Sequence, residues 1–198
     1  MTEARVRPTG RRAGDSGTRD AILDAALRLF AEHGYDGASI RAIAGAAGVD
    51  PALVRHFFGD KDALFTTAVA QRTTIVQRLA DALAGDDALA GRRVARTYLE
   101  LWEAPATRPV LLALARSATT SPRAAGMLAE IIGGRILPPH DDMTGPAVRR
   151  IALAGSHLLG LAMARHVLAL PPLSAPSLDE LVDAVAPTIQ RYLTGTAG

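Results

Sequence analysis

Apolar residues recur at intervals of three and four along almost the whole chain, which is the spacing of one face of an α-helix. Alternating β-branched runs bounded by turn residues, the pattern of a β-strand, are missing from the sequence. The sequence therefore predicts an all-α fold. No segment repeats with a period of about 20 to 50 residues, so a solenoid is not expected.

The first two expected helices are both ended by glycine. The first begins near Thr18 and ends at Gly34, and the second is capped by Ser39 and ends before Gly48. Glycine adopts the left-handed backbone that ends a helix at little cost. The second helix is short, so it needs tertiary contacts to be stable.

Two further helices follow closely. Asp50 is a suitable N-cap for the third, and Pro51 occupies its first helical position, where a missing N–H breaks no hydrogen bond. This helix is expected to end near Phe58. Asp60 then caps a long fourth helix over residues 61–83.

The remaining sequence predicts five more helices, separated by proline- or glycine-containing loops. The last begins with a capping box, in which Ser177 and Glu180 each bond the other's backbone N–H. The expected ranges are 88–103, 106–118, 122–137, 147–170 and 178–193.

A glycine turn joins the two short helices at about residues 39–58, so that the second helix can enter the major groove of DNA. The N-terminal residues resemble the DNA-binding domain of the tetracycline-repressor (TetR-like) family. The C-terminal part resembles that family through its helix layout and the stretch 158–166. The matching N-terminal motifs are Arg19-Asp-Ala-Ile-Leu-Asp-Ala-Ala-Leu-Arg-Leu-Phe-Ala-Glu-His-Gly-Tyr35, Ser39-Ile-Arg-Ala-Ile-Ala, Ala47-Gly-Val49 and Phe58-Gly-Asp-Lys-Asp-Ala-Leu64.

This resemblance implies an N-terminal three-helix DNA-binding domain and a larger helical ligand-binding and dimerisation domain, with about nine helices in all. The expected divisions are an Arg-rich arm at 1–17, the DNA-binding domain at 18–65 and the C-terminal domain at 66–198. The implied function is a DNA-binding regulator, a repressor that binds a palindromic operator as a homodimer and is released by a small, hydrophobic effector. No cofactor is implied.

The resemblance also assigns roles by position. Ser39, Arg55, His56 and Lys61 would bind backbone phosphates, Pro51, Ala52 and Leu53 would face bases, and Arg41 would touch either. The sequence departs from the family pattern at Arg55, where tyrosine is usual, and at 51–53, where lysine, glycine and threonine are frequent. Base recognition is therefore the least transferable role.

Helix geometry supports the same outward face independently. If Val54 and the two residues 57–58 point inward, steps of about 100° turn Ala52, Arg55 and His56 outward. Arg55 is then predicted to bind either a guanine edge or a phosphate.

Net charge alone does not indicate nucleic-acid binding. The chain carries +2, and residues 18–65 hold five basic and seven acidic residues, which leaves −2. Helix N-termini at Ser39 and Lys61 would compensate, because their free N–H groups attract phosphates. The arginines of the arm either contact DNA as well or form a solvated tail.

Large or adaptable side chains on the middle helices are the candidates for an effector pocket. Each of them also fits plain core packing. Trp102 and His157 are preferred, although His157 also fits a hydrogen-bonded histidine at an interface. The candidates are Tyr98, Trp102, Met127, Ile131, His157 and Met163.

The helices at 147–170 and 178–193 have more apolar surface than one subunit can cover, which predicts a four-helix bundle between two subunits. Small residues at every fourth position of the first helix would permit close approach. The expected interface residues are Ala152, Ser156, Leu159, Gly160, Leu178, Val182, Val185 and Ile189.

Other classes of function find less support. No motif of a hydrolase, zinc protease or phosphate-binding loop is present, and the metal-like cluster at 140–142 is interpreted as a solvated loop. The absence of cysteine favours a reducing cytoplasm. The longest apolar stretch, 151–164, is shorter than the roughly 20 residues that span a bilayer. A helical small-molecule-binding protein without DNA binding, and an activator of the same fold, remain the alternatives.

Overall fold

The computed structural model of the chain describes the backbone of residues 11–71, 74–84, 87–135 and 145–195, and the side chains of 16–70, 74–84, 87–130 and 145–195. All secondary structure in these described residues is helical, which confirms the all-α prediction. They form eleven α-helices and one short 3-10 helix, more than the nine expected.

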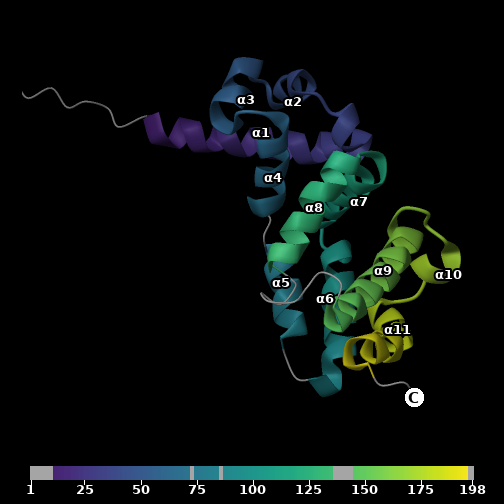
Figure 1. Cartoon of the computed structure of the whole chain (residues 1–198). Helices are drawn as coiled ribbons and strands as arrows, with labels where there is room; N and C mark the ends of the chain where they lie inside the picture. Colours follow the sequence, from purple (N-terminus) through teal and green to yellow (C-terminus); the bar gives the residue numbers. More distant parts are fainter. Residues whose placement is uncertain (1–10, 72–73, 85–86, 136–144, 196–198) are drawn as a thin grey trace, which may run out of the picture.

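The N-terminal half of the chain contains the first group of helices (Figure 1). Their bounds are α1 (Arg11–Gly37), α2 (Ile40–Ala47), α3 (Pro51–Phe58), α4 (Lys61–Gln71), α5 (Thr74–Leu83) and the 3-10 helix η1 (Asp87–Leu89). The second group consists of α6 (Ala90–Glu103), α7 (Arg108–Thr120), α8 (Pro122–Arg135), α9 (Pro146–His166), α10 (Pro171–Ser174) and α11 (Leu178–Thr194).

Several boundaries differ from the sequence-based prediction. Helix α1 begins at Arg11, seven residues before the expected start at Thr18. The expected fourth helix corresponds to two helices, α4 and α5, with residues 72–73 outside the described part of the chain. Helix α9 ends at His166, and the short α10 follows it. These differences account for the larger number of helices.

The predicted helix ends around the DNA-binding motif are confirmed. Gly34 has φ 70° and ψ 178°, which breaks the helical path of α1. Gly48 has φ 68° in the left-handed region and ends α2. A side chain would be strained at either φ, so glycine sets where these helices stop. The capping box of Ser177 and Glu180 at the start of α11 is also present.

One apolar core extends from α1 through α8 and includes Ala162 of α9. It contains Phe30 of α1, Val54 of α3, Phe65 of α4 and Leu111 of α7, all buried. Helix α1 packs extensively on α7, so the N-terminal helices share their core with the helices that follow. The expected domain division at residue 65 remains a prediction.

Two smaller apolar clusters hold the C-terminal helices together. Ala95 of α6, Leu158 of α9 and Ile189 of α11 meet in one of them, and Leu99 and Val182 meet in the other. In Figure 1, α9 and α11 lie beside α6, at the end of the molecule away from α2 and α3. Among the described residues, no helix is long and apolar enough to cross a membrane.

Candidate nucleic-acid interface

Helices α2 and α3 form a helix-turn-helix whose ends are fixed by side-chain caps. Ser39 Oγ accepts a hydrogen bond from Ala42 N at 3.1 Å at the start of α2. Asp50 Oδ1 accepts one from Ala52 N at 2.7 Å at the start of α3, with Pro51 in the first helical position. Both caps match the sequence prediction. They hold α3 at the outer edge of the molecule (Figure 1).

Helix α3 turns a polar face outward. Val54 and Phe58 are 1 % and 7 % exposed and pack into the core. Ala52, Arg55 and His56 are exposed, as helix geometry predicted, and Phe57 is half-buried. A guanidinium and an imidazole are therefore free to meet a ligand that approaches α3 from outside. Their roles in binding DNA remain a prediction.

The other predicted DNA contacts surround this face. Ser39 at the start of α2 and Arg41 in its first turn are exposed, and Pro51 and Leu53 at the start of α3 are half-buried. The structure thus brings these residues onto the neighbouring helices α2 and α3. Their contacts with bases and phosphates stay predictions.

Lys61, the predicted phosphate contact at the start of α4, lies over the ring of Tyr35. Its Nζ is 4.3 Å from the ring centroid, within cation–π range. Burial lowers the pKa of Lys61, and the carboxylate of Asp36 opposes that shift. Asp60 caps the same helix end by accepting a hydrogen bond from Ala63 N at 2.8 Å.

Sequence reasoning missed the aromatic support behind this helix end. Tyr35 stacks on Phe30, with ring centroids 6.0 Å apart, and meets Phe65 edge to face at 5.3 Å. Arg19 of α1 lies over the Phe58 ring at 5.2 Å. Gly34 and Tyr35 belong to the TetR-like motif of the sequence, but only the folded chain reveals that the Tyr35 ring lies under Lys61.

Four of the effector candidates share one apolar cluster. Trp102 is 1 % exposed, and Tyr98, Met127 and Met163 pack as half-buried residues against the same core. The Tyr98 and Trp102 rings are 6.5 Å apart. Burial raises the pKa of Tyr98 to about 12.

The two remaining candidates are His157 and Ile131. His157 contacts Tyr192 of α11, with ring centroids 6.0 Å apart. Ile131 lies in α8, but its side chain falls outside the described residues. The metal-like cluster at 140–142 also falls outside them. A pocket formed by all six candidates therefore remains a prediction.

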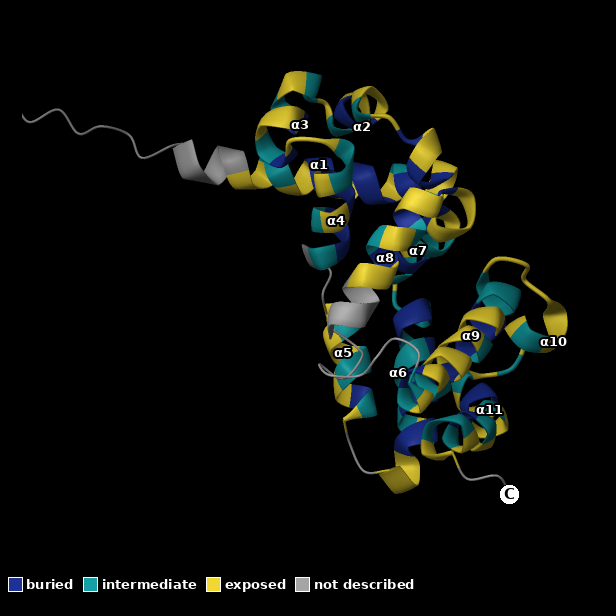
Figure 2. Ribbon diagram, viewed as in Figure 1, coloured by how far each residue is buried: buried dark blue, intermediate teal, exposed yellow. Residues whose placement is uncertain are grey.

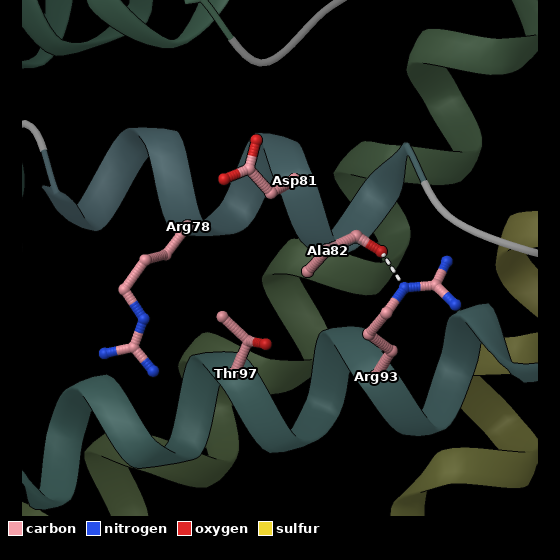
Figure 3. Close-up of a pocket in the computed structure, with 5 residues that line it drawn as sticks. All are labelled: Arg78, Asp81, Ala82, Arg93 and Thr97. Carbon is pink, nitrogen blue, oxygen red and sulfur yellow. Dashed lines mark hydrogen bonds between the residues drawn. The ribbon is translucent and has the colours of Figure 1, made fainter.

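The structure has an open hollow elsewhere, between α5 and α6 (Figure 3). Its volume is about 250 Å³, and none of the effector candidates lines it. The guanidinium groups of Arg78 and Arg93 lie at opposite ends of it, and Arg93 Nε donates to the Ala82 carbonyl at 2.7 Å. The two cations thus diverge instead of converging on one ligand.

Of the residues predicted for the dimer surface, those on α9 are exposed in the single subunit, whereas two of those on α11 are buried. Ala152, Ser156, Leu159 and Gly160 are all exposed on α9, along which Figure 2 shows exposed residues. Val182 and Ile189 of α11, in contrast, are each 0 % exposed within the single subunit. These two residues pack against α6, so they are not available to a partner.

The other two α11 residues are only partly covered. Leu178 and Val185 are half-buried and pack beside the same clusters. The apolar stripe predicted for α11 is present, but its main partner is α6 of the same chain. The periodicity of one helix does not reveal which surface will cover it.

A group of polar contacts joins the ends of α6 and α9 near the effector candidates, and no sequence motif predicted it. The Glu103 carboxylate at the end of α6 accepts a hydrogen bond from Arg165 Nε of α9 at 2.8 Å. Arg165 also donates to the Pro176 carbonyl at 2.9 Å. His166 stacks on Trp102 at 5.6 Å and 9°. These contacts connect the end of α9 to the end of α6 and to the segment that precedes α11.

Comparison with known proteins gives two family matches that together span most of the chain. Residues 22–68 match the family described as bacterial regulatory proteins, tetR family. Residues 88–193 match the tetracyclin repressor-like C-terminal domain. A crystal structure of a TetR-family regulator from Streptomyces coelicolor A3 is 35% identical, covers 93% of this chain and 99% of that one, and superposes with a TM-score of 0.65.

Curated relatives match through shorter segments. The HTH-type transcriptional repressor AcnR of Corynebacterium glutamicum is 49% identical over 55 residues, which are 27% of this chain and 29% of AcnR. The HTH-type transcriptional regulator BetI of Rhizobium meliloti is 37% identical over 82 residues, 41% of this chain and 36% of BetI. The match thus spans less than half the length of either relative.

Proposed function

Because this chain belongs to the tetR family of bacterial regulatory proteins, we propose that it is a transcriptional repressor that binds operator DNA as a homodimer and is released by a small effector. The observation that carries the proposal is the capped helix α3, which presents Arg55 and His56 outward. A helix presented in this way fits the major groove.

Backbone contacts would come from the ends of the neighbouring helices. Ser39 caps α2 and Lys61 begins α4, and the N–H groups of each first turn that the caps of Ser39 and Asp60 leave over would favour a phosphate. These local groups offset the net charge of −2 over residues 18–65. Arg55 then supplies the strongest hydrogen-bonding group for a base edge, with Ala52 or Leu53 beside a thymine methyl.

A homodimer would present α3 twice. Half-sites in palindromic operators are about 34–36 Å apart, so two recognition helices must be held at that spacing. The exposed face of α9 is the surface that we assign to the partner subunit, because Leu153 and Leu159 are 45 % and 41 % exposed on it. From α11, the exposed Ala184 and Pro187 replace the buried Val182 and Ile189 in this role.

The effector site is assigned to the cluster of Tyr98, Trp102, Met127 and Met163, which is aromatic, thioether-rich and apolar. Such a lining favours a hydrophobic effector. An effector bound there would lower the affinity for DNA by favouring a conformation in which the two α3 helices no longer fit adjacent grooves. A DNA-binding role places the protein in the cytoplasm with the chromosome.

Selection of bound duplexes from random DNA, by the full-length protein at low salt, tests the proposal. The expected product is a palindrome with two half-sites about one helical turn apart, bound by two chains. The selection is then repeated in the presence of hydrophobic candidate ligands. The ligand that is the effector should reduce the amount of duplex recovered. Expression of a reporter gene whose promoter contains the selected sequence then distinguishes repression from activation. Failure to enrich any sequence would favour a ligand-binding protein without DNA binding.

A further inference from the structure

The carboxylate of Asp62 joins three helices. One of its oxygens accepts a hydrogen bond from the Tyr35 hydroxyl at the end of α1. The other accepts one from Arg123 Nε of α8 at 2.7 Å, and the Nη2 of the same guanidinium bonds it too. Asp62 itself stands in the first turn of α4. A residue of the C-terminal half thus reaches the helix end that carries Lys61.

The position of this carboxylate matters for a polyanionic ligand. Asp62 follows Lys61, and Lys61 lies over the ring of the same Tyr35 that bonds Asp62. A negative charge beside a proposed phosphate contact repels the phosphate, and a bonded guanidinium offsets that repulsion. Arg123 is therefore placed to neutralise a charge that would oppose DNA binding.

A second contact one helical turn further on keeps α8 beside α4. Thr66 Oγ1 lies 3.8 Å from Met127 Sδ, and both residues are four positions beyond Asp62 and Arg123. At the start of α8, Ser121 and Ala124 are 2 % and 0 % exposed, so the backbone that carries Arg123 is anchored in the core. The side chain of Arg123 is itself 71% exposed. Its position therefore depends on where α8 lies relative to α4.

We propose that Arg123 is a positioning residue for DNA binding, which neutralises Asp62 and holds the Tyr35–Lys61 pair at the start of α4. This inference rests on the proposed function. Met127, an effector candidate on the same helix, links the proposed effector cluster to this contact.

The test measures the affinity of the full-length protein for the selected palindromic duplex across a series of salt concentrations. Arg123→Ala should weaken binding roughly threefold to tenfold at low salt, because each subunit of the dimer then presents an uncovered carboxylate, and the loss should shrink as salt screens it. Arg123→Lys keeps the charge and should retain most of the affinity. Thermal unfolding of each variant verifies that it is folded.

A double-mutant cycle separates neutralisation of Asp62 from a direct contact between Arg123 and DNA. In an Asp62→Asn background, Arg123→Ala should have little effect, since no carboxylate remains to be covered. An equal loss in both backgrounds would overturn the inference, and so would Arg123→Lys behaving like Arg123→Ala.

The matched control is Arg96→Ala, which removes the same charge from an exposed ion pair with Asp179 between α6 and α11. It should change the affinity much less than Arg123→Ala. If the wild-type protein binds the duplex and Arg123→Ala binds it equally well, only the inference fails. If the wild-type protein binds no duplex at all, the proposed function fails and the inference falls with it.

Discussion

Gly91 on α6 donates its backbone N–H to Oε1 of Gln190 on α11 at 2.6 Å. A Cβ atom added to Gly91 would lie 2.4 Å from the backbone N of Gln190 and 2.5 Å from the carbonyl oxygen of Ala186. Gln190 Nε2 donates in turn to the Asp87 carbonyl, at 2.5 Å. Helices α6 and α11 therefore touch through their backbones, and only glycine permits that approach.

Gly91→Ala should lower the free energy of unfolding by about 1–3 kcal/mol, because the added methyl group forces the two backbones apart. Chemical denaturation followed by the fluorescence of Trp102, the only tryptophan, measures this change. The matched control is Gly126→Ala in α8, where no atom lies within 4 Å of an added Cβ. That variant should gain up to about 1 kcal/mol from helix propensity. Equal effects at both positions would contradict the close approach.

Arg55→Ala should weaken binding to the selected duplex by about 1–3 kcal/mol if Arg55 reads a guanine, and should relax the preference at a single base pair. The measurement compares affinities for the duplex and its single-base variants. A uniform loss over all sequences would assign Arg55 to a phosphate instead. Arg78→Ala, in an exposed pair with Glu100 far along the chain from α3, is the control and should bind as the wild type does.

Leu159→Glu should convert the proposed homodimer to a monomer at micromolar concentration, because two carboxylates would face each other in the proposed apolar interface along α9. Sedimentation measures the mass of the protein in solution. The affinity for the palindrome should also fall, because a monomer binds only one half-site at a time. Leu89→Glu is the control, because Leu89 is also exposed but belongs to η1. A wild-type monomer, or a dimer that survives Leu159→Glu, would contradict this assignment of the α9 face.

We expect His166 to lower the free energy of unfolding at mildly acidic pH. Burial lowers the pKa of His166, the Glu103 carboxylate opposes that shift, and the Arg108 and Arg165 guanidinium groups add to it. The side chain is 8% exposed, and its Nε2 has no hydrogen-bond partner among the described residues. The folded chain therefore takes up this proton less readily than the unfolded chain does.

The sign follows from that difference in proton binding. Well above the ordinary histidine pKa of about 6.5, the imidazole is neutral in both states and costs nothing. As the pH falls below that value, the unfolded chain binds the proton first, so the free energy of unfolding decreases. Denaturation at pH values of about 7.5 and 5.5 should reveal a smaller decrease for His166→Gln than for the wild type. An identical decrease in both proteins would show that His166 does not contribute.

Local sequence rules predicted the helix-turn-helix in detail. The caps at Ser39 and Asp50, the proline that begins α3 and the left-handed Gly48 each depend on a few neighbouring residues, and all are present in the structure. The outward direction of Arg55 and His56 followed from helical spacing alone. The same holds for the capping box at Ser177.

Local sequence rules did not predict the contacts between segments that are distant in the sequence. The α11 stripe was assigned to a partner subunit, whereas Val182 and Ile189 are covered by the chain's own α6. The bond from Arg123 to Asp62 and the stacking of His166 on Trp102 each join residues about 60 positions apart. Charged and aromatic residues at such separations carry no periodic pattern that reveals their partner.

The sequence by itself determined where helices begin and end around the DNA-binding motif, because capping, proline geometry and glycine φ are properties of short segments. Only the tertiary structure decided which apolar faces meet within one subunit and which stay exposed on it. That choice depends on the shapes of whole helices packed together, as at Gly91, where a single missing side chain sets the distance between α6 and α11.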